Sequence, residues 1–216
     1  MSKVNLAISG CMGRMGQQLV KSSRVDKNFK LTTLTENRLV KKKVVIGTTG
    51  FTKKEENLIK NFSRKIPILK AGNMSLGINL LMYLTEIASS SLGKNFLSKI
   101  FEIHHKHKKD YPSGTALMLG KGIAVGRSKS FYNLIGKKYL NKKTFPYGKK
   151  INFNSMRKGK IIGEHEVKFS SGKEIITLNH EAFDRALYSE GALPAAKWLI
   201  NKKPGLYSMR NLMNFK

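Results

Sequence analysis

The fold of the N-terminal half is decided by the stretch Val4-Asn5-Leu6-Ala7-Ile8-Ser9-Gly10-Cys11-Met12-Gly13-Arg14-Met15-Gly16. Its first five residues form a short, mainly apolar run that predicts a buried strand, and the residues after Gly16 have the composition of a helix. Strand, glycine-rich turn and helix, in this order, are the context of a dinucleotide-binding loop. The stretch therefore predicts an α/β domain that binds a dinucleotide cofactor.

The three glycines of this turn have different tasks. Gly10 permits a tight turn, Gly13 lets the backbone approach a pyrophosphate, and Gly16 permits close packing of the helix against the strand. Arg14, at the start of the helix, is a candidate phosphate ligand. The spacing G-x-x-G-x-x-G differs from the usual G-x-G-x-x-G, so a glycine-rich turn without a ligand is the alternative interpretation.

An acidic residue at a suitable distance favours the cofactor interpretation. A second predicted strand, Phe29 to Leu34, ends near Glu36. Glu36 follows Gly16 by about 20 residues, the separation at which a carboxylate contacts the adenosine ribose in dinucleotide-binding domains.

Two further predicted strands each end in a loop of small residues. Val44-Val45-Ile46 leads into Gly47-Thr48-Thr49-Gly50, and Thr52-Lys53-Lys54-Glu55 then has the pattern of a capping box that opens a helix to about Phe62. The strand Ile66 to Leu69 leads into Ala71-Gly72-Asn73-Met74-Ser75. Open α/β sheets bind ligands at the carboxyl ends of their strands, so both loops are candidate parts of the cofactor site.

The richest chemistry lies between Glu102 and Leu117, which hold three of the five histidines. The preceding run, Phe96 to Ile103, predicts a strand, so the histidines lie where a strand passes into a loop. Pro112 breaks the chain direction, and Ser113 is a good N-cap for a following helix. The first amides of that helix, with lysines 106, 108 and 109 nearby, would bind a carboxylate.

A histidine beside such an anion site titrates near neutral pH and suits general acid catalysis. A lone histidine at a strand end is more often a structural residue, and any single lysine of this chain is more often a surface charge. Adjacent histidines point to opposite faces of a strand, so only one of His104 and His105 is expected to face a cleft.

The remainder of the chain predicts more sheet and one helix. Lys160 to Phe169 and Lys173 to Leu178 are predicted strands of a hairpin. Glu190 to Ile200 is a predicted helix that Pro194 should start or kink. The region from Gly126 to Lys150 is polar, rich in lysine and the most loop-like part of the chain.

Composition restricts the class of protein. The 216 residues carry a formal net charge of +28, which makes nucleic-acid binding an alternative, but the lysines are dispersed in pairs and triples and no nucleic-acid-binding module is present. The single Cys11 excludes internal disulfides and fits a reducing cytoplasm. No segment predicts a membrane span or secretory signal, and no cysteine and histidine spacing predicts a metal site.

Several of these segments resemble the 4-hydroxy-tetrahydrodipicolinate reductase (dihydrodipicolinate reductase) family of lysine biosynthesis. The His-His to Ser-Gly-Thr signature within Glu102–Leu117 is the most specific, and the similarity runs in order along nearly the whole chain. The other matching segments are Gly13–Gly16, Val45–Phe51, Asn73–Gly77, Gly163–Glu166, Gly191-Ala192 and Trp198-Leu199.

The resemblance implies the reduction of a cyclic dicarboxylate with NADH or NADPH. It implies that His104 is the general acid and Lys108 a second proton donor, and that His105, Gly114 and Thr115 bind substrate. It implies a larger group of cofactor contacts: Gly10, Cys11, Met12, Gly13, Arg14, Met15, Glu36, Gly47, Thr48, Thr49, Ala71, Gly72, Asn73 and Met74.

The resemblance also implies a domain organisation. A shortened, Rossmann-like dinucleotide-binding domain would comprise residues 1–75 and 186–216. An α+β domain, residues 76–185, would bind substrate and form a homotetramer through a mixed sheet.

The chain departs from the family pattern in its nucleotide half. Only Asn37 to Lys43 separates Glu36 from Val44, where the family carries additional chain on the order of one or two βαβ units. The strand at Val44 should therefore lie directly beside one of the first two strands or leave a gap in the sheet. Asn37 stands where the family often has an arginine for a 2′-phosphate, and Tyr111 stands where alanine is usual.

These departures leave three hypotheses. The first is a nicotinamide-dependent reductase, the second is a catalytically impaired relative that has lost part of the cofactor site, and the third is a basic nucleic-acid-binding protein on the same fold.

Overall fold

The computed structural model describes residues 3–35, 43–135 and 151–215. The chain forms two compact units: Met1–Leu76 with Arg185–Lys216, and Gly77–Asp184. No helix among the described residues combines the length and apolar character needed to cross a bilayer.

The first unit begins with the predicted strand, turn and helix. Strand β1 (Val4–Ser9) is parallel to β2 (Phe29–Thr35), and helix α1 (Arg14–Val25) connects them. The two strands form a sheet of their own.

A second, three-stranded sheet completes this unit. Strand β4 (Pro67–Lys70) lies between β3 (Val44–Ile46) and β9 (Gly205–Tyr207), and all three are parallel. Helix α2 (Lys53–Ser63) connects β3 to β4 and begins with the predicted capping box, in which Thr52 Oγ1 accepts a hydrogen bond from the Glu55 amide. The helices α6 (Ala186–Leu199) and α7 (Met209–Leu212) also belong to this unit, whose core contains Leu69, Met74, Ala195, Leu199 and Met209.

Of the two predicted arrangements, in which the strand at Val44 lies beside one of the first two strands or leaves a gap, the structure has the gap between β1 and β3. Within residues 3–35 and 43–76, β1 pairs only with β2, and β3 pairs only with β4. Ile8 is the buried residue of β1, and the others are half-buried or exposed, so the prediction of a fully buried strand is wrong. Parallel sheets are normally covered on both faces, and among the described residues β1 has β2 as its one neighbouring strand.

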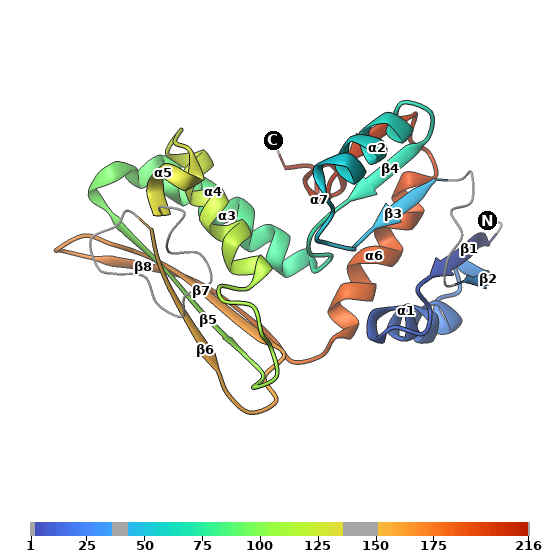
Figure 1. Cartoon of the computed structure of the whole chain (residues 1–216), viewed down its shortest axis with the longest axis horizontal. Helices are drawn as coiled ribbons and strands as arrows, with labels where there is room; N and C mark the ends of the chain where they lie inside the picture. Colours follow the sequence, from blue (N-terminus) through green and yellow to red (C-terminus); the bar gives the residue numbers. More distant parts are fainter. Residues whose placement is uncertain (1–2, 36–42, 136–150, 216) are drawn as a thin grey trace. The chain divides into compact units, whose positions relative to one another are not determined.

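Helix α6 links the two sheets of this unit. It contacts α1 on one side and β3 and β4 on the other, as its central position in Figure 1 illustrates. Ser189 Oγ lies 2.8 Å from Ser22 Oγ of α1, and Lys197 Nζ donates a hydrogen bond to Asn28 Oδ1. The β1–α1–β2 segment is therefore attached largely through a helix that comes from the far end of the chain.

The second unit is a four-stranded mixed sheet covered on one face by helices (Figure 1). Strand β5 (Leu97–His104) is parallel to β6 (Ile151–Arg157) and antiparallel to β7 (Gly163–Ser170), which pairs with β8 (Ile175–Ala182). The covering helices are α3 (Leu76–Leu92), α4 (Gly114–Gly126) and α5 (Phe131–Ile135), with a short 3₁₀ helix, η1 (Gly93–Asn95), before β5. The core includes Ile100, Leu119, Ile123, Phe153 and Phe169.

Three features differ from the sequence-based expectations. Helix α6 begins at Ala186, before the expected start at Glu190, and contains Pro194 in its interior, so of the two predicted effects Pro194 does not start the helix. The strands β6 and β9 were not expected. The loop-like region after Gly126 contains α5, and its residues 136–150 lie outside the described part of the chain.

Candidate active site

The C-terminal end of β5 carries a carboxylate and an imidazole on the same face of the sheet. Side chains two residues apart in a strand share a face, so Glu102 and His104 both point toward the covering helices. Glu102 is 1% exposed and His104 8% exposed. The Nδ1 atom of His104 lies 2.5 Å from Oε2 of Glu102. This contact directs the other ring nitrogen, Nε2, away from the carboxylate.

The second oxygen of Glu102 contacts two other segments. Oε1 accepts a hydrogen bond from Arg157 NH2 of β6 at 3.0 Å and from the Ser113 amide at 3.1 Å. Burial raises the pKa of Glu102, but hydrogen bonds from His104, Ser155 and Arg157 outweigh burial and lower the pKa to about 2. Glu102 is therefore an anion at neutral pH.

A second histidine, His165 of β7, packs edge-on against His104, with ring centroids 5.0 Å apart. Burial, followed by the nearby positive charge of His104, lowers the pKa of His165 to about 3. Its Nε2 lies 3.3 Å from Ser113 Oγ, which also accepts a hydrogen bond from the Ala116 amide. His165 is therefore neutral at physiological pH and supports the N-cap of α4.

Donor atoms of Glu102, His104 and His165 lie within 4.8 Å of one another, which is close enough to hold a metal ion. The two oxygens of Glu102 already contact His104 and Arg157. A cation next to the Arg157 guanidinium would be repelled, so the cluster suits proton transfer better than metal binding.

The loop between β5 and α4 is attached to Arg157. The guanidinium donates hydrogen bonds to the Lys108 and Asp110 carbonyls and stacks on the Tyr111 ring, 4.1 Å from its centroid. Lys108 Nζ lies 2.8 Å from Asp110 Oδ1. Tyr111, a departure from the family pattern, thus covers the arginine that binds Glu102.

The start of α4 has the predicted form of an anion site. Ser113 is the N-cap, no acidic residue lies in the first turn, and open space surrounds the Cα of Gly114 where a side chain would stand. The amides of Gly114 and Thr115 belong to this first turn, where helix amides favour an anionic group. His105, Lys108, Gly114 and Thr115 all lie in or beside the segment that leads from β5 into α4.

The glycine loop of the first unit has the backbone that a dinucleotide requires. Gly10 has a positive φ of 72°, and a Cβ at Gly16 would lie 1.9 Å from the Gly10 carbonyl oxygen, so helix and loop approach as only glycine permits. Helix α1 begins after Gly13 without a side-chain cap. Met12, Gly13 and Arg14 are exposed. These residues therefore fit a pyrophosphate.

The other proposed cofactor contacts lie in the loops that follow β3 and β4, at the carboxyl ends of these strands in the three-stranded sheet. A Cβ at Gly47 would lie 3.6 Å from the Met74 side chain, so the two loops are adjacent. Thr48, Thr49 and Gly72 are exposed, whereas Asn73 and Met74 are buried. Asn73 Oδ1 accepts a hydrogen bond from the Ser75 amide. Glu36 lies outside the described residues.

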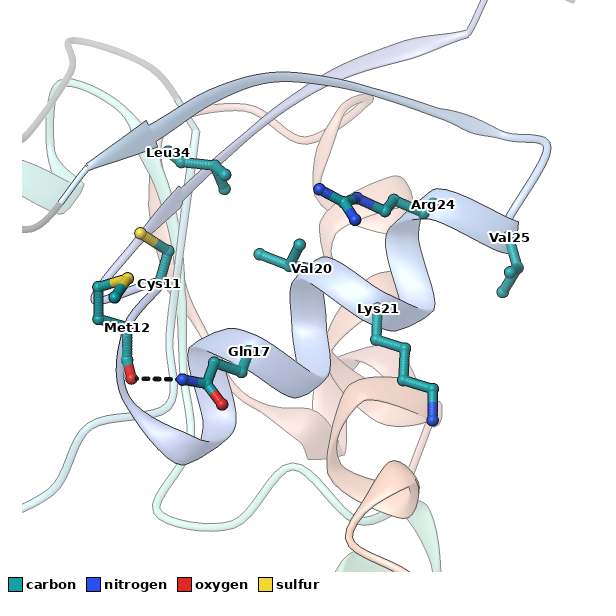
Figure 2. A pocket seen from close by; sticks show the side chains of 8 residues that line it. All are labelled: Cys11, Met12, Gln17, Val20, Lys21, Arg24, Val25 and Leu34. Atoms are coloured by element: carbon teal, nitrogen blue, oxygen red, sulfur yellow. Dashed lines mark hydrogen bonds between the residues drawn. The ribbon is translucent and has the colours of Figure 1, made fainter.

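A pocket lies between the glycine loop, α1 and β2 (Figure 2). Cys11 and Met12 lie at one end near Leu34, and Gln17 Nε2 donates a hydrogen bond to the Met12 carbonyl. Apolar and cationic side chains line the pocket together, which suits a ligand with a ring and anionic groups; the lining residues are Cys11, Met12, Gln17, Val20, Lys21, Arg24, Val25 and Leu34.

Two sequence models of one family match this chain. The model for the C-terminus of dihydrodipicolinate reductase matches residues 77–213, and the model for its N-terminus matches residues 33–74. The chain belongs to the dihydrodipicolinate reductase family. Within that family, it is 67% identical to a curated 4-hydroxy-tetrahydrodipicolinate reductase from Pelagibacter ubique (strain HTCC1062), over 100% of both chains. It is 35% identical to the reductase of Zymomonas mobilis, over 98% of this chain and 89% of the relative.

The alignment with the Pelagibacter reductase also measures the shortening. The alignment extends over 258 positions, whereas this chain has 216 residues. At least 42 positions of the alignment therefore have no counterpart in this chain. The fold agrees with a solved structure described as dipicolinate-bound dihydrodipicolinate reductase from Paenisporosarcina sp. TG-14. That structure is 20% identical, with a TM-score of 0.77 over 97% of this chain and 99% of the other.

Sequence reasoning identified His104 but assigned no role to Glu102, Arg157 or His165. The alternation of a strand is sufficient to place Glu102 on the face of His104. No sequence signal pairs these two with Arg157 and His165, because strand pairing is non-local.

Proposed function

We propose that this chain reduces 4-hydroxy-tetrahydrodipicolinate to tetrahydrodipicolinate in lysine and diaminopimelate biosynthesis. The full-length 67% identity to a curated reductase of that name carries the proposal. As a member of this family, the chain is an NAD(P)H-dependent oxidoreductase with a dinucleotide-binding N-terminal domain. We further propose that it acts in the cytoplasm as a homotetramer, and light scattering tests the oligomeric state.

The second unit supplies the substrate site in this proposal. The amides of Gly114 and Thr115, together with His105 and Lys108, bind the carboxylates of the substrate. His104 donates a proton from Nε2 as the substrate is reduced. The pairing of its Nδ1 with Glu102 supports this role, because a carboxylate at one ring nitrogen stabilises the imidazolium and orients the other nitrogen.

Lys108 has a second role as proton donor. Its ammonium group is paired with Asp110, whose carboxylate is exposed. A substrate carboxylate that displaced Asp110 would bring Lys108 to the reacting atoms.

The first unit supplies the cofactor site, and the bound nicotinamide supplies the hydride. The glycine loop from Gly10 to Met15 binds the pyrophosphate. Glu36 would bind the adenosine ribose, and the loops at Gly47–Thr49 and Ala71–Met74 would supply further cofactor contacts. The close packing at Gly16 and the uncapped start of α1 support this assignment.

The gap between β1 and β3 favours one alternative, a relative in which cofactor binding is weakened. Three experiments distinguish the alternatives. Oxidation of NADH with freshly prepared substrate, followed by absorbance, tests the reductase directly. Absence of oxidation, with weak quenching of NADH fluorescence, would indicate the impaired relative. Salt-dependent retention on DNA would instead favour the nucleic-acid-binding protein.

A further inference from the structure

We propose that Glu102 is a positioning residue of the reductase, which holds His104 protonated and oriented and attaches the Lys108 loop and the start of α4 to the same point. This inference rests on the proposed function, because it concerns the acid of that reaction. It assigns a role to a buried carboxylate that lies beside the proton donor.

Glu102 is in direct contact with the ring of His104. Glu102 Oε2 lies 2.5 Å from His104 Nδ1, and both atoms are buried. A carboxylate at Nδ1 holds a hydrogen on that nitrogen and stabilises the imidazolium, so Nε2 becomes the donating atom. The Glu102 carboxylate is thereby placed to act through His104 without contact to the substrate.

The other carboxylate oxygen of Glu102 contacts two further segments. Oε1 binds the Ser113 amide at the start of α4 and the guanidinium of Arg157. Arg157 in turn donates to the Lys108 and Asp110 carbonyls. A single carboxylate thus connects three parts of the proposed substrate site, namely the acid, the lysine loop and the anion-binding helix start.

The charged groups around His104, other than Glu102, are mainly basic. The groups that act on this cluster from the other strands and the loop are basic: Arg157 on β6, His165 on β7, His180 on β8 and Lys108. Asp110 is exposed and is paired with Lys108. Without the Glu102 charge, an imidazolium at His104 would face mainly positive or neutral bases, which would favour loss of its proton.

A structural role alone does not account for a charge at position 102. Burying an ion pair is costly, and an apolar residue of similar volume is often at least as stable. Glu102 is fully buried between Ile100 and His104 on a face that otherwise packs as a core. A charge at this position is explained by what it does to His104.

The test compares Glu102→Gln, which keeps the shape and removes the charge, with Glu102→Asp, which keeps the charge but withdraws it by one methylene. Glu166→Gln is the matched control, because Glu166 lies on the adjacent strand β7 with its side chain on the opposite face of the sheet. The rate of NADH oxidation is measured across pH at saturating and limiting substrate.

For Glu102→Gln we expect kcat to fall about 10²-fold with KM nearly unchanged, because the group acts in the proton-transfer step. The alkaline limb of the pH profile of kcat should shift to lower pH by about one unit or more. Glu102→Asp should lie between wild type and Glu102→Gln in both respects, and Glu166→Gln should match wild type. Equal losses in both Glu102 variants with an unmoved alkaline limb would show a purely structural role.

A readout without turnover makes the inference independent of the proposed function. The titration of the His104 ring is followed by ¹⁵N NMR in substrate-free protein, with His104→Gln to assign the signal. Glu102→Gln should lower the titration midpoint by about one pH unit or more, and Glu102→Asp should lower it less. If Glu102→Gln does not fold, Glu102→Asp decides the matter alone, and an unchanged midpoint overturns the inference. Wild-type protein that fails to oxidise NADH refutes the proposed function, while the NMR titration still decides the role of Glu102.

Discussion

Gly163 of β7 lies directly against the ring of His104: a Cβ built at Gly163 would stand 3.0 Å from His104 Nε2 and 3.3 Å from Cδ2. The glycine therefore leaves room for the nitrogen that the proposed mechanism uses to donate a proton. Because Glu102 holds the opposite side of the ring at 2.5 Å, the imidazole cannot retreat without breaking that contact.

Gly163→Ala should therefore displace the imidazole and lower kcat by about 10-fold or more, since misplacement of about 1 Å can cost up to about 10²-fold in rate. The affinity for NADH, measured by fluorescence, should not change. Gly172→Ala in the β7–β8 turn is the control, because a Cβ at Gly172 would meet no atom within 4 Å. Full activity of Gly163→Ala would mean that Nε2 is not the donating atom.

His104→Gln should lower turnover by about 10²–10⁴-fold, the typical cost of removing a general acid, with almost unchanged NADH affinity. His107→Gln serves as the control, because His107 belongs to the same histidine cluster but is exposed. Single-turnover kinetics with NADH measure the chemical step. Near-normal turnover of His104→Gln would remove His104 from the mechanism.

The chain should prefer NADH or use both cofactors about equally, and it should not strongly prefer NADPH. A carboxylate at Glu36 accepts hydrogen bonds from ribose hydroxyls and repels a 2′-phosphate, and Asn37 provides no compensating positive charge. The ratio of kcat/KM for the two cofactors measures the preference, and Glu36→Ala should shift it toward NADPH. A large advantage for NADPH in wild type would mean that Arg38 or Lys41–Lys43 bind the phosphate.

Stability should decrease on acidification in two windows. The pKa of His165 falls from 6.5 to about 3 on folding, so the unfolded chain binds the extra proton and stability is lost as pH falls from about 6.5 toward 3. This loss amounts to at most about 3 kcal/mol at pH 4. The pKa of Glu102 falls from 4.5 to about 2, so its contribution is present above pH 4.5 and is lost toward pH 2. Urea unfolding at pH 7 and pH 4 tests the first window. The difference between the two free energies of unfolding should be smaller in His165→Gln than in wild type.

Amide exchange should reveal the gap in the first unit. Amides of β1 and β3 should exchange faster than those of β5 and β7, because among the described residues β1 and β3 each pair on one edge only and are incompletely covered, whereas β5 and β7 pair on both edges. Hydrogen exchange followed by mass spectrometry measures this difference. Equal protection of the two sets, together with micromolar NADH binding, would show that the shortened segment is tolerated.

Local sequence determined the elements that depend on short-range interactions. The tight glycine loop at Gly10, the capping box of Thr52 and Glu55, and the Ser113 N-cap each use atoms a few residues apart. Such interactions are set by residue type and spacing, so the strand–loop–helix units and the position of His104 at a strand end were predictable.

Only the tertiary structure decided which groups surround the acid and where the sheet ends. Glu102, Arg157 and His165 come from three strands, β5, β6 and β7, whose register places them together. Strand pairing joins residues far apart in the chain and is not encoded by local pattern. The same reason applies to β1 and β3. Each forms as its local sequence predicts, but their place in two separate sheets depends on which strands pair.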